Sequence, residues 1–332
     1  MAETTVEQMT APLEKALKNN APELGVERVV AIERFTSGLS SQSYGVDVET
    51  GDGPVRWVMR VEPEHGVIPP YDIAREYRLL REVHAAGLPA PGVFLLEEDA
   101  SVVGGPFIMM HFIEGAIYRN TDARLSEDLA LLADVQERFI DMLARIHETP
   151  QSVLPNFETG QEAARAEVAV CRHRLKMTEL LPSPVLRHAL DVLDEHAPPA
   201  EKIGLLHGDY RLPNLMWKDG EISGVLDWEL ARVGDPLSDL AFTQTIGRGV
   251  CSLEGELATK YSERTGVEID EKRVNYYRLL EMVKGTIIGL AGAYDLANGG
   301  ADLRLMSVAR IAAAGQAMMG ALESQLEQYL EA

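Results

Sequence analysis

The pattern of apolar residues differs between the first part of this chain and the rest, and this difference limits the folds that the chain can adopt. The first part holds short runs rich in β-branched and aromatic residues, separated by Gly, Ser and Asp. These runs lie at 27–35, 44–50, 55–61, 93–97 and 106–113. After Gly115, apolar residues recur at three- and four-residue spacing, which is the period of amphipathic helices. Strands followed by helices predict an α+β fold, with a join near 110–116.

The helices can be placed by their period and by the residues that end them. One helix is predicted within the first part, over 71–87, and Gly87 closes it because glycine favours the position after a helix. A compact strand–loop–strand region at 203–230 interrupts the later helices. Those helices are predicted over 126–147, 160–180, 184–196 and most of 236–331.

Charge and hydropathy exclude several classes of function. The net charge of −21 at pH 7 repels a polyanion, so we expect no nucleic-acid partner. The acidic start of the chain lacks the apolar core of a signal peptide. The most apolar late stretch, 279–297, contains Glu281, Lys284 and Asp295, which favours a buried helix over a membrane span. We therefore expect a cytoplasmic protein with no membrane partner.

One short constellation carries the chemistry. An apolar run ends in His-Gly-Asp at 207–209, Asn214 follows five positions after the Asp, and a second apolar run ends in Asp227. Phosphoryl transfer needs an aligned hydroxyl and neutralised phosphate charge. An Asp can orient the hydroxyl and accept its proton, while Asn and Asp oxygens are ligands that Mg²⁺ prefers. Asp209 is therefore the candidate base, and Asn214 and Asp227 are the candidate metal ligands.

This pattern resembles the aminoglycoside phosphotransferase and choline kinase superfamily, whose members share the fold of protein kinases. It is most similar to the kinase-like domain that is fused to acyl-CoA dehydrogenases and to its free-standing bacterial relatives. The segments that carry this likeness are 208–214, 226–229 and 234–241. The resemblance spans roughly 30–300 and is strongest over 205–241.

The resemblance implies the architecture and the reaction. The fold would be bilobal and protein-kinase-like, with an antiparallel-sheet lobe over 1–110 and a larger, mostly helical lobe over 111–332. The reaction would move the γ-phosphate of ATP to a hydroxyl of a small molecule, with Mg²⁺ as cofactor and GTP as the alternative donor. The smaller lobe would bind the nucleotide, and the larger would carry catalysis and bind the acceptor.

The resemblance also implies a loop that covers the phosphates. Residues 36–44 stand between two strand-like runs, where that loop belongs. Backbone N–H groups there would cap the β- and γ-phosphates. The residues assigned to this role are Ser40, Ser41, Gln42 and Ser43. This segment has one glycine instead of the three of the protein-kinase pattern, so by itself it would predict an ordinary hairpin loop.

Two further parts of a nucleotide site follow from the resemblance. Arg60 stands where protein kinases have the lysine that contacts the α- and β-phosphates, and an always-charged arginine can keep that role. Glu76, on the next predicted helix, would be its partner carboxylate. The run 107–115 resembles the hinge strand, where backbone groups at Met110 and Phe112 would meet the edge of the adenine.

Around the base, the resemblance implies supporting roles. Arg211 stands two positions after Asp209, and it either contacts the γ-phosphate or makes a structural ion pair within the loop. His207 would pack and hydrogen-bond in the loop, and Asp239 would brace it by accepting backbone N–H bonds. His147, at the end of a predicted helix, is interpreted as a helix-end residue, since positive charge is favourable there.

Three other functions stay open. A pseudokinase would bind a nucleotide without turnover, although Asp209, Asn214 and Asp227 are all present. A metal-dependent phosphohydrolase could use His207, Asp209 and Asp227, but it would leave Asn214 without a role. An aminoglycoside or macrolide resistance kinase is the third.

The acceptor is open as well: a hydroxylated acyl chain or its thioester, an amino alcohol, a sugar or an antibiotic. The apolar stretch 272–297 favours a metabolite kinase with a lipid-like substrate. We expect a monomer or a homodimer.

Overall fold

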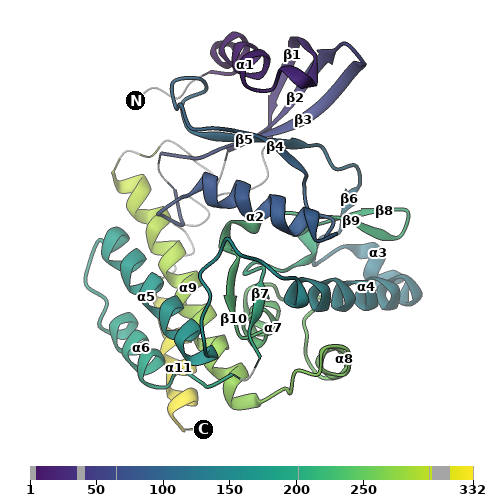
Figure 1. Cartoon of the computed structure of the whole chain (residues 1–332). Helices are drawn as coiled ribbons and strands as arrows, with labels where there is room; N and C mark the ends of the chain where they lie inside the picture. Colours follow the sequence, from purple (N-terminus) through teal and green to yellow (C-terminus); the bar gives the residue numbers. More distant parts are fainter. Residues whose placement is uncertain are drawn as a thin grey trace. The chain divides into compact units, whose positions relative to one another are not determined.

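The computed structural model describes residues 5–35, 42–64, 66–200, 202–298, 300 and 315–331. The chain forms two compact units, which Figure 1 colours along the sequence. The first unit comprises Met1–Ala85 and Ala90–Ile113, and the second comprises Ala86–Pro89 and Glu114–Ala332. The chain therefore enters the second unit briefly after residue 85, before it returns to finish the first.

A five-stranded antiparallel sheet forms the first unit. Its order is β1-β2-β3-β5-β4. The strands are β1 (Val26–Arg34), β2 (Gln42–Thr50), β3 (Gly53–Val61), β5 (Phe107–His111) and β4 (Val93–Glu97). A two-residue turn joins β2 to β3, because Thr50 pairs with Gly53. Strand β3 lies in the middle and is bonded to a neighbour on each side, so the position of its side chains is fixed by two ladders.

Two helices complete the first unit. Helix α1 (Val6–Asn20) buries Met9, Leu13 and Leu17 in the same core as residues of β1, β2 and β3, and Figure 1 shows it beside β1. Helix α2 (Ile73–Ala85) buries one face, which includes Glu76. A short 3₁₀ turn, η1 (Pro22–Leu24), links α1 to the sheet. The sequence analysis did not predict α1.

The second unit contains two small sheets. In one, β7 (Gly204–Leu206) pairs antiparallel with β10 (Arg232–Gly234). In the other, the order is β6-β8-β9. Its strands are β6 (Ala116–Ile117), β8 (Leu215–Lys218) and β9 (Glu221–Val225). The sequence predicted the β7, β8 and β9 region as one strand–loop–strand segment, but it did not indicate β6.

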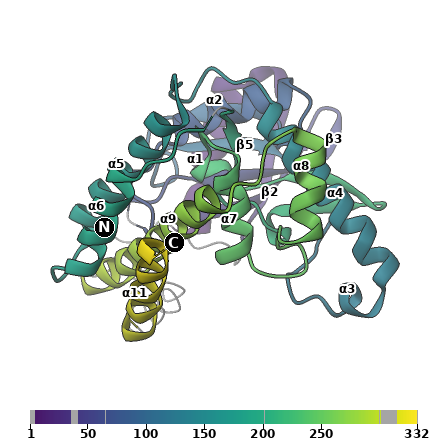
Figure 2. The ribbon, with the colours of Figure 1, turned by 90° about the horizontal axis from the view of Figure 1, so that it is seen from below.

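Helices make up most of the second unit. They are α3 (Ala123–Glu127), α4 (Leu129–Glu148), α5 (Gly160–Thr178), α6 (Pro184–Glu195), α7 (Leu237–Thr245), α8 (Glu256–Thr265), α9 (Glu271–Ala297) and α11 (Gly315–Glu331). Side chains of Asp128, Thr159, Ser183 and Asp270 cap the starts of α4, α5, α6 and α9. Helix α9 is central, since α5, α6, α7 and α11 all contact it (Figure 2).

The predicted α+β architecture is confirmed: an antiparallel sheet comes first and a mostly helical part follows. The apolar stretch 279–297 lies inside α9, where Glu281 and Lys284 are buried among polar partners. Within the described part of the chain, no helix has the length and apolar character needed to cross a membrane.

Candidate active site

The candidate catalytic loop, residues 207–214, begins where β7 ends and finishes in a 3₁₀ turn, η2 (Leu212–Asn214), that leads into β8. Gly208 adopts φ +83°, a left-handed conformation that other residues rarely adopt. A Cβ atom at Gly208 would lie 2.3 Å from the Leu230 carbonyl oxygen and 2.5 Å from Nη1 of Arg232. The loop therefore makes a close backbone contact that only glycine allows.

Asp239 holds the start of this loop. Its carboxylate, fully buried in the first turn of α7, accepts hydrogen bonds from the backbone N–H groups of His207 (2.8 Å) and Gly208 (2.9 Å). Burial alone would raise the pKa of Asp239, but the hydrogen bond from His147 and the positive charge of Arg232 outweigh it and hold the pKa below its ordinary value. Asp239 is thus an ionised acceptor at neutral pH.

His147 belongs to the same network, and the sequence analysis missed this role. From the last turn of α4, its Nε2 donates to Asp239 (3.1 Å) and its Nδ1 pairs with the Tyr261 hydroxyl (2.6 Å). A signal was present: His147 follows Phe139 and Leu143 at four-residue spacing, on the apolar face of its helix. A polar residue on a buried face needs a buried partner.

His207 is locked in one neutral tautomer. Its Nδ1 accepts from the backbone N–H of Asp209 (3.2 Å), and its Nε2 donates to the Leu226 carbonyl (2.9 Å). Burial lowers the pKa of His207, against the pull of the Asp239 and Asp227 charges. With both ring nitrogens engaged, this side chain ties the catalytic loop to the end of the β8–β9 hairpin.

The carboxylate of Asp209 sits between two nitrogen donors. Arg211 Nε lies 2.9 Å from Oδ1, and Asn214 Nδ2 donates to Oδ2 at 2.8 Å. Burial raises the pKa of Asp209 to about 6, and the charge of Asp227 adds to that rise, whereas Arg211 and Asn214 oppose it. Arg211 thus makes an ion pair within the loop in this structure.

Asn214 and Asp227 are brought together by backbone hydrogen bonding. The N–H of Leu226 donates to the Asn214 carbonyl at 2.8 Å, which places Asp227, the next residue, beside Asn214. The Asn214 amide nitrogen also donates to the Asp209 carbonyl (2.8 Å), so its side-chain oxygen is turned away from Asp209. Asp227 itself has φ +68° and ψ +60°, an uncommon conformation outside glycine, just before η3 (Trp228–Leu230).

These donors suit one kind of metal ion. An amide oxygen and one carboxylate are hard oxygen ligands of the type Mg²⁺ accepts, and Mg²⁺ takes its remaining ligands from water and phosphate. In the part of the chain that the structure describes, no three His, Cys, Asp or Glu side chains cluster as a metal site. The side-chain oxygens of Asn214 and Asp227 therefore fit Mg²⁺ that completes its ligand set with water and phosphate.

The first unit holds the other predicted residues. Arg60 Nε lies 3.2 Å from Glu76 Oε1, and each side chain is only 10% exposed. Arg60 pairs in the sheet with Ser43 on one side, which places Ser43 and its neighbour Gln42 at the start of β2 beside it. Ser40 and Ser41 lie outside the described residues.

The predicted hinge residues end strand β5. Met110 is buried in the strand and pairs with Val58. Phe112 follows the strand and is 41% exposed, with the guanidinium carbon of Arg56 5.8 Å from the centroid of its ring.

A β-sheet unit with a buried Arg–Glu pair, followed by a helical unit with a braced Asp loop, defines a kinase-like phosphotransferase fold. The sequence model of the phosphotransferase enzyme family matches residues 31–286, and the chain belongs to that family. The predicted resemblance is therefore confirmed.

Curated relatives and solved structures agree with this membership. Acyl-CoA dehydrogenase family member 10 of Mus musculus is 29% identical over 238 residues, which cover 70% of this chain and 22% of that protein. This chain spans between 22% and 40% of the length of such curated relatives.

Two solved structures show the same fold at low identity. Choline kinase LicA from Streptococcus pneumoniae has a TM-score of 0.64 at 15% identity and covers 96% of this chain and 99% of its own. A thermostable mutant of the aminoglycoside phosphotransferase APH(4)-Ia, in a ternary complex with AMP-PNP and hygromycin B, has a TM-score of 0.60 at 20% identity. It covers 96% of this chain and 98% of its own.

Proposed function

We propose that this protein is an ATP-dependent small-molecule kinase that transfers the γ-phosphate to a hydroxyl group, with Asp209 as the base. The observation that carries the proposal is the convergence of a largely buried carboxylate, Asp209, with the side-chain oxygens of Asn214 and Asp227. Family membership supplies the reaction class, because the family is one of phosphotransferases.

The role of Asp209 follows from its surroundings. A pKa of about 6 leaves the carboxylate ionised at neutral pH, yet close enough to the working pH to take a proton. The acceptor hydroxyl would donate its hydrogen bond to an Asp209 oxygen, which orients the hydroxyl oxygen for attack. As the new O–P bond forms, the bond from the γ-phosphorus to the β–γ bridging oxygen breaks, ADP leaves, and the hydroxyl proton passes to that carboxylate. Asn214 keeps the carboxylate in place through its hydrogen bond to Oδ2.

Mg²⁺ would be held by Asn214 Oδ1 and the Asp227 carboxylate together with phosphate oxygens. When bound, it neutralises charge on the transferred phosphoryl group. The donor side would use Arg60, held by Glu76, for the phosphates, and the backbone near Met110 and Phe112 for adenine. The AMP-PNP in the APH(4)-Ia complex supports a nucleoside triphosphate as donor. The Arg211–Asp209 ion pair supports the structural one of the two roles expected for Arg211.

For the acceptor, we propose a hydroxylated acyl metabolite. The names of the curated relatives support this class, since they denote acyl-CoA dehydrogenases that share this part of their chain. The largely apolar helix α9 is consistent with it. Resistance to an aminoglycoside is the second candidate, because APH(4)-Ia was solved with hygromycin B.

The phosphohydrolase alternative is disfavoured by one contact set. It requires a ring nitrogen of His207 as a metal ligand, but both nitrogens of His207 are engaged with backbone groups. A pseudokinase remains an outcome of the test below.

The test combines melting temperature with turnover. Mg-ATP should raise the melting temperature of the wild-type protein by a few degrees, because a ligand that binds only the folded state stabilises it. Asp227→Ala should abolish the Mg²⁺-dependent part of that shift. Asp191→Ala, which removes an exposed carboxylate, should leave it intact. The absence of any shift with ATP or GTP at millimolar concentration would overturn the proposal.

Turnover then separates a kinase from a pseudokinase. Release of ADP would be followed with hydroxyacyl thioesters, amino alcohols and aminoglycosides as acceptors. Asp209→Asn should keep the Mg-ATP shift but lose turnover by at least about a hundredfold, the size usual for a general base. A nucleotide shift without turnover on any acceptor would instead identify a pseudokinase.

A further inference from the structure

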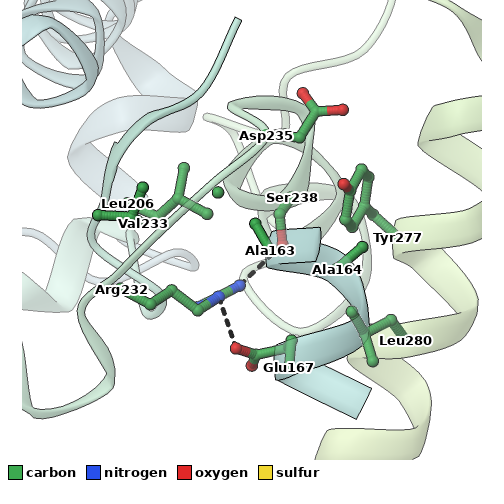
Figure 3. A pocket seen from close by; sticks show the side chains of 11 residues that line it. Ala163, Ala164, Glu167, Leu206, Arg232, Val233, Asp235, Ser238, Tyr277 and Leu280 are labelled. Atoms are coloured by element: carbon green, nitrogen blue, oxygen red, sulfur yellow. Dashed lines mark hydrogen bonds and ion pairs between the residues drawn. The ribbon is translucent and has the colours of Figure 1, made fainter. Parts of the chain in front are cut away.

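The second unit contains a cluster of four charged side chains, two of them buried and two largely buried, that the proposed reaction does not use. They are Glu167 on α5, Arg232 on β10, and Glu281 and Lys284 on α9, and they are called here the buried charge cluster. Figure 3 shows Arg232 reaching across a small cavity, with its guanidinium between Glu167 and Ser238. Ala163, Ala164 and Tyr277 line the same cavity.

The cluster is internally neutral and closely bonded. Arg232 Nε lies 3.2 Å from Glu167, and its Nη2 donates to Ser238 (2.7 Å) and to Glu281 (3.2 Å). Lys284 Nζ bridges the two carboxylates, 3.1 Å from Glu167 and 3.0 Å from Glu281. Burial alone would raise the pKa of Glu167, but the charges of Arg232 and Lys284 lower it to about 2. Glu167 and Arg232 are therefore ionised at neutral pH.

A cluster of buried charges contributes little net stability to a fold. Apolar residues of similar volume often replace buried ion pairs without loss, because removing charges from water costs as much as their attraction returns. A particular arrangement of four charges is better explained by the geometry that it imposes on its neighbours. The neighbours of Arg232 show what that geometry is.

Arg232 connects the cluster to the catalytic loop. Its Nη1 donates to the Leu230 carbonyl at 3.3 Å. The same carbonyl and the same Nη1 are the atoms against which Gly208 packs, at distances that leave no room for a Cβ. Strand β10, which carries Arg232, also pairs with β7, the strand that leads into the loop, with Arg232 opposite Leu206.

The charge of Arg232 acts on the other support of the loop as well. It favours the ionised form of Asp239, whose carboxylate accepts the N–H groups of His207 and Gly208. The Arg232 guanidinium therefore packs against Gly208, donates a hydrogen bond to the neighbouring Leu230 carbonyl, and favours the ionised form of Asp239. No other cation of the cluster makes these contacts, since the hydrogen bonds of Lys284 go to Glu167 and Glu281.

We propose that Arg232 is a positioning residue: its bonds to Glu167, Ser238 and Glu281 aim its guanidinium at the Leu230 carbonyl and Gly208, and this contact holds the backbone of the catalytic loop in place for Asp209. The catalytic consequence rests on the proposed function, but the effect on the loop does not. The fork of the guanidinium is essential, because a lysine cannot bond Glu167, Ser238, Glu281 and Leu230 at once.

Amide hydrogen exchange tests the proposal without any substrate. Arg232→Met should make the amides of 205–214 exchange roughly tenfold or more faster than in the wild type. Lys284→Met is the matched control, because it removes one positive charge from the same cluster. It should leave exchange in 205–214 within about twofold of the wild type, even where global stability falls. Equal acceleration in both variants, or none in Arg232→Met, would overturn the proposal.

A conservative variant keeps the test decisive if Arg232→Met fails to fold. Arg232→Lys keeps the charge and should preserve the cooperative unfolding transition, while 205–214 still exchanges several-fold faster. Unchanged exchange in Arg232→Lys would show that charge alone suffices, and it would overturn the positioning role of the fork.

Turnover of Mg-ATP supplies the second readout. Arg232→Lys should lower kcat several-fold with little change in KM for ATP, whereas Lys284→Met should keep kcat close to the wild-type value. Wild-type protein that neither binds nor turns over Mg-ATP would refute the proposed kinase function, and the exchange result would still decide the role of Arg232. Wild-type turnover with an unchanged kcat in Arg232→Lys would refute the role of Arg232 alone.

Discussion

The two units position their charged side chains by different means. In the first unit, Arg60 stands on a central strand and Glu76 on a helix, so regular backbone hydrogen bonds position both side chains. In the second unit, Asp209 stands on an irregular loop. There the positioning is done by side chains that bond the loop backbone, chiefly Asp239 and His207.

This difference has an energetic consequence. The Arg60–Glu76 pair can be replaced as a pair, because the opposite charges of its two members compensate each other. The acceptors at the catalytic loop cannot be removed in the same way, because buried backbone N–H groups would be left without partners. We therefore expect stability to depend on the loop supports, and nucleotide affinity on the pair.

The largest effect is expected at Asp239. Asp239→Asn replaces an acceptor of three hydrogen bonds with a group that has one oxygen and an NH₂, so at least one buried donor is left unsatisfied. The expected loss in the free energy of unfolding is about 3–5 kcal/mol, measured by urea denaturation. The matched control is Asp191→Asn, an exposed carboxylate paired with Arg172, which should cost less than about 1 kcal/mol. Similar losses of stability in Asp239→Asn and Asp191→Asn would contradict the supporting role of Asp239.

The next effect concerns the backbone of the loop. Gly208→Ala adds a methyl group that meets the Leu230 carbonyl and also strains a positive φ. Gly220→Ala is the control, because Gly220 has φ +80° but open space around its Cβ position. Gly220→Ala should lower the free energy of unfolding by about 1–2 kcal/mol because of its positive φ alone, and Gly208→Ala should lower it clearly more. Equal costs by thermal denaturation would mean that the close contact of Gly208 adds nothing.

Asp209 should give a smaller effect with a distinctive pH dependence. Its pKa in the folded protein, about 6, lies above the ordinary value of 3.8, so folding favours the protonated form. The stability from this group is complete below about pH 4 and is lost as pH rises through 6. Asp209→Asn, in nucleotide-free buffer with EDTA, should therefore be more stable than wild type at pH 8, by about 1–3 kcal/mol.

That advantage of Asp209→Asn should vanish near pH 4. Asp52→Asn, in the exposed turn between β2 and β3, is the control for the same carboxylate-to-amide change away from the site. If Asp209→Asn instead became more stable relative to wild type as the pH fell, the result would contradict the raised pKa of Asp209.

The smallest effect is expected when both members of the first-unit pair are removed. Arg60→Met combined with Glu76→Met should change the free energy of unfolding by no more than about 1 kcal/mol, because a buried ion pair can be exchanged for apolar residues. Either single change should cost more, since it leaves one charge buried alone. The double variant should nevertheless lose most of its Mg-ATP melting shift. Retention of that shift would separate the pair from nucleotide binding.

Sequence alone predicted the parts of the molecule that depend on local pattern. The strands of the first unit and helices α2, α4, α5 and α6 follow from period and turn residues, and the α+β fold is confirmed. The spacing of Asp209, Asn214 and Asp227 indicated one site because a short hairpin joins them. Their assigned roles stay predictions.

The supports of the loop could not be predicted in the same way. His147 lies 92 residues before Asp239, and Glu281 lies 49 residues after Arg232. Each looks like an ordinary helix or strand residue until the fold places a partner beside it. Helix α1 was missed for a related reason: its buried residues face a sheet formed later in the chain, and Pro12 inside it argues against a helix.

The brief passage of the chain through the second unit at Ala86–Pro89 limits how this protein can be divided. The Pro89 carbonyl accepts the N–H of Val225 at 2.7 Å, and Arg145 donates to the Gly87 carbonyl at 2.9 Å. A gene fragment that begins at Glu114 would lack both acceptors, although it encodes all the rest of the second unit. Any exchange of the first unit between homologous enzymes must therefore carry a compatible turn at 86–89, or the end of the catalytic hairpin loses a support.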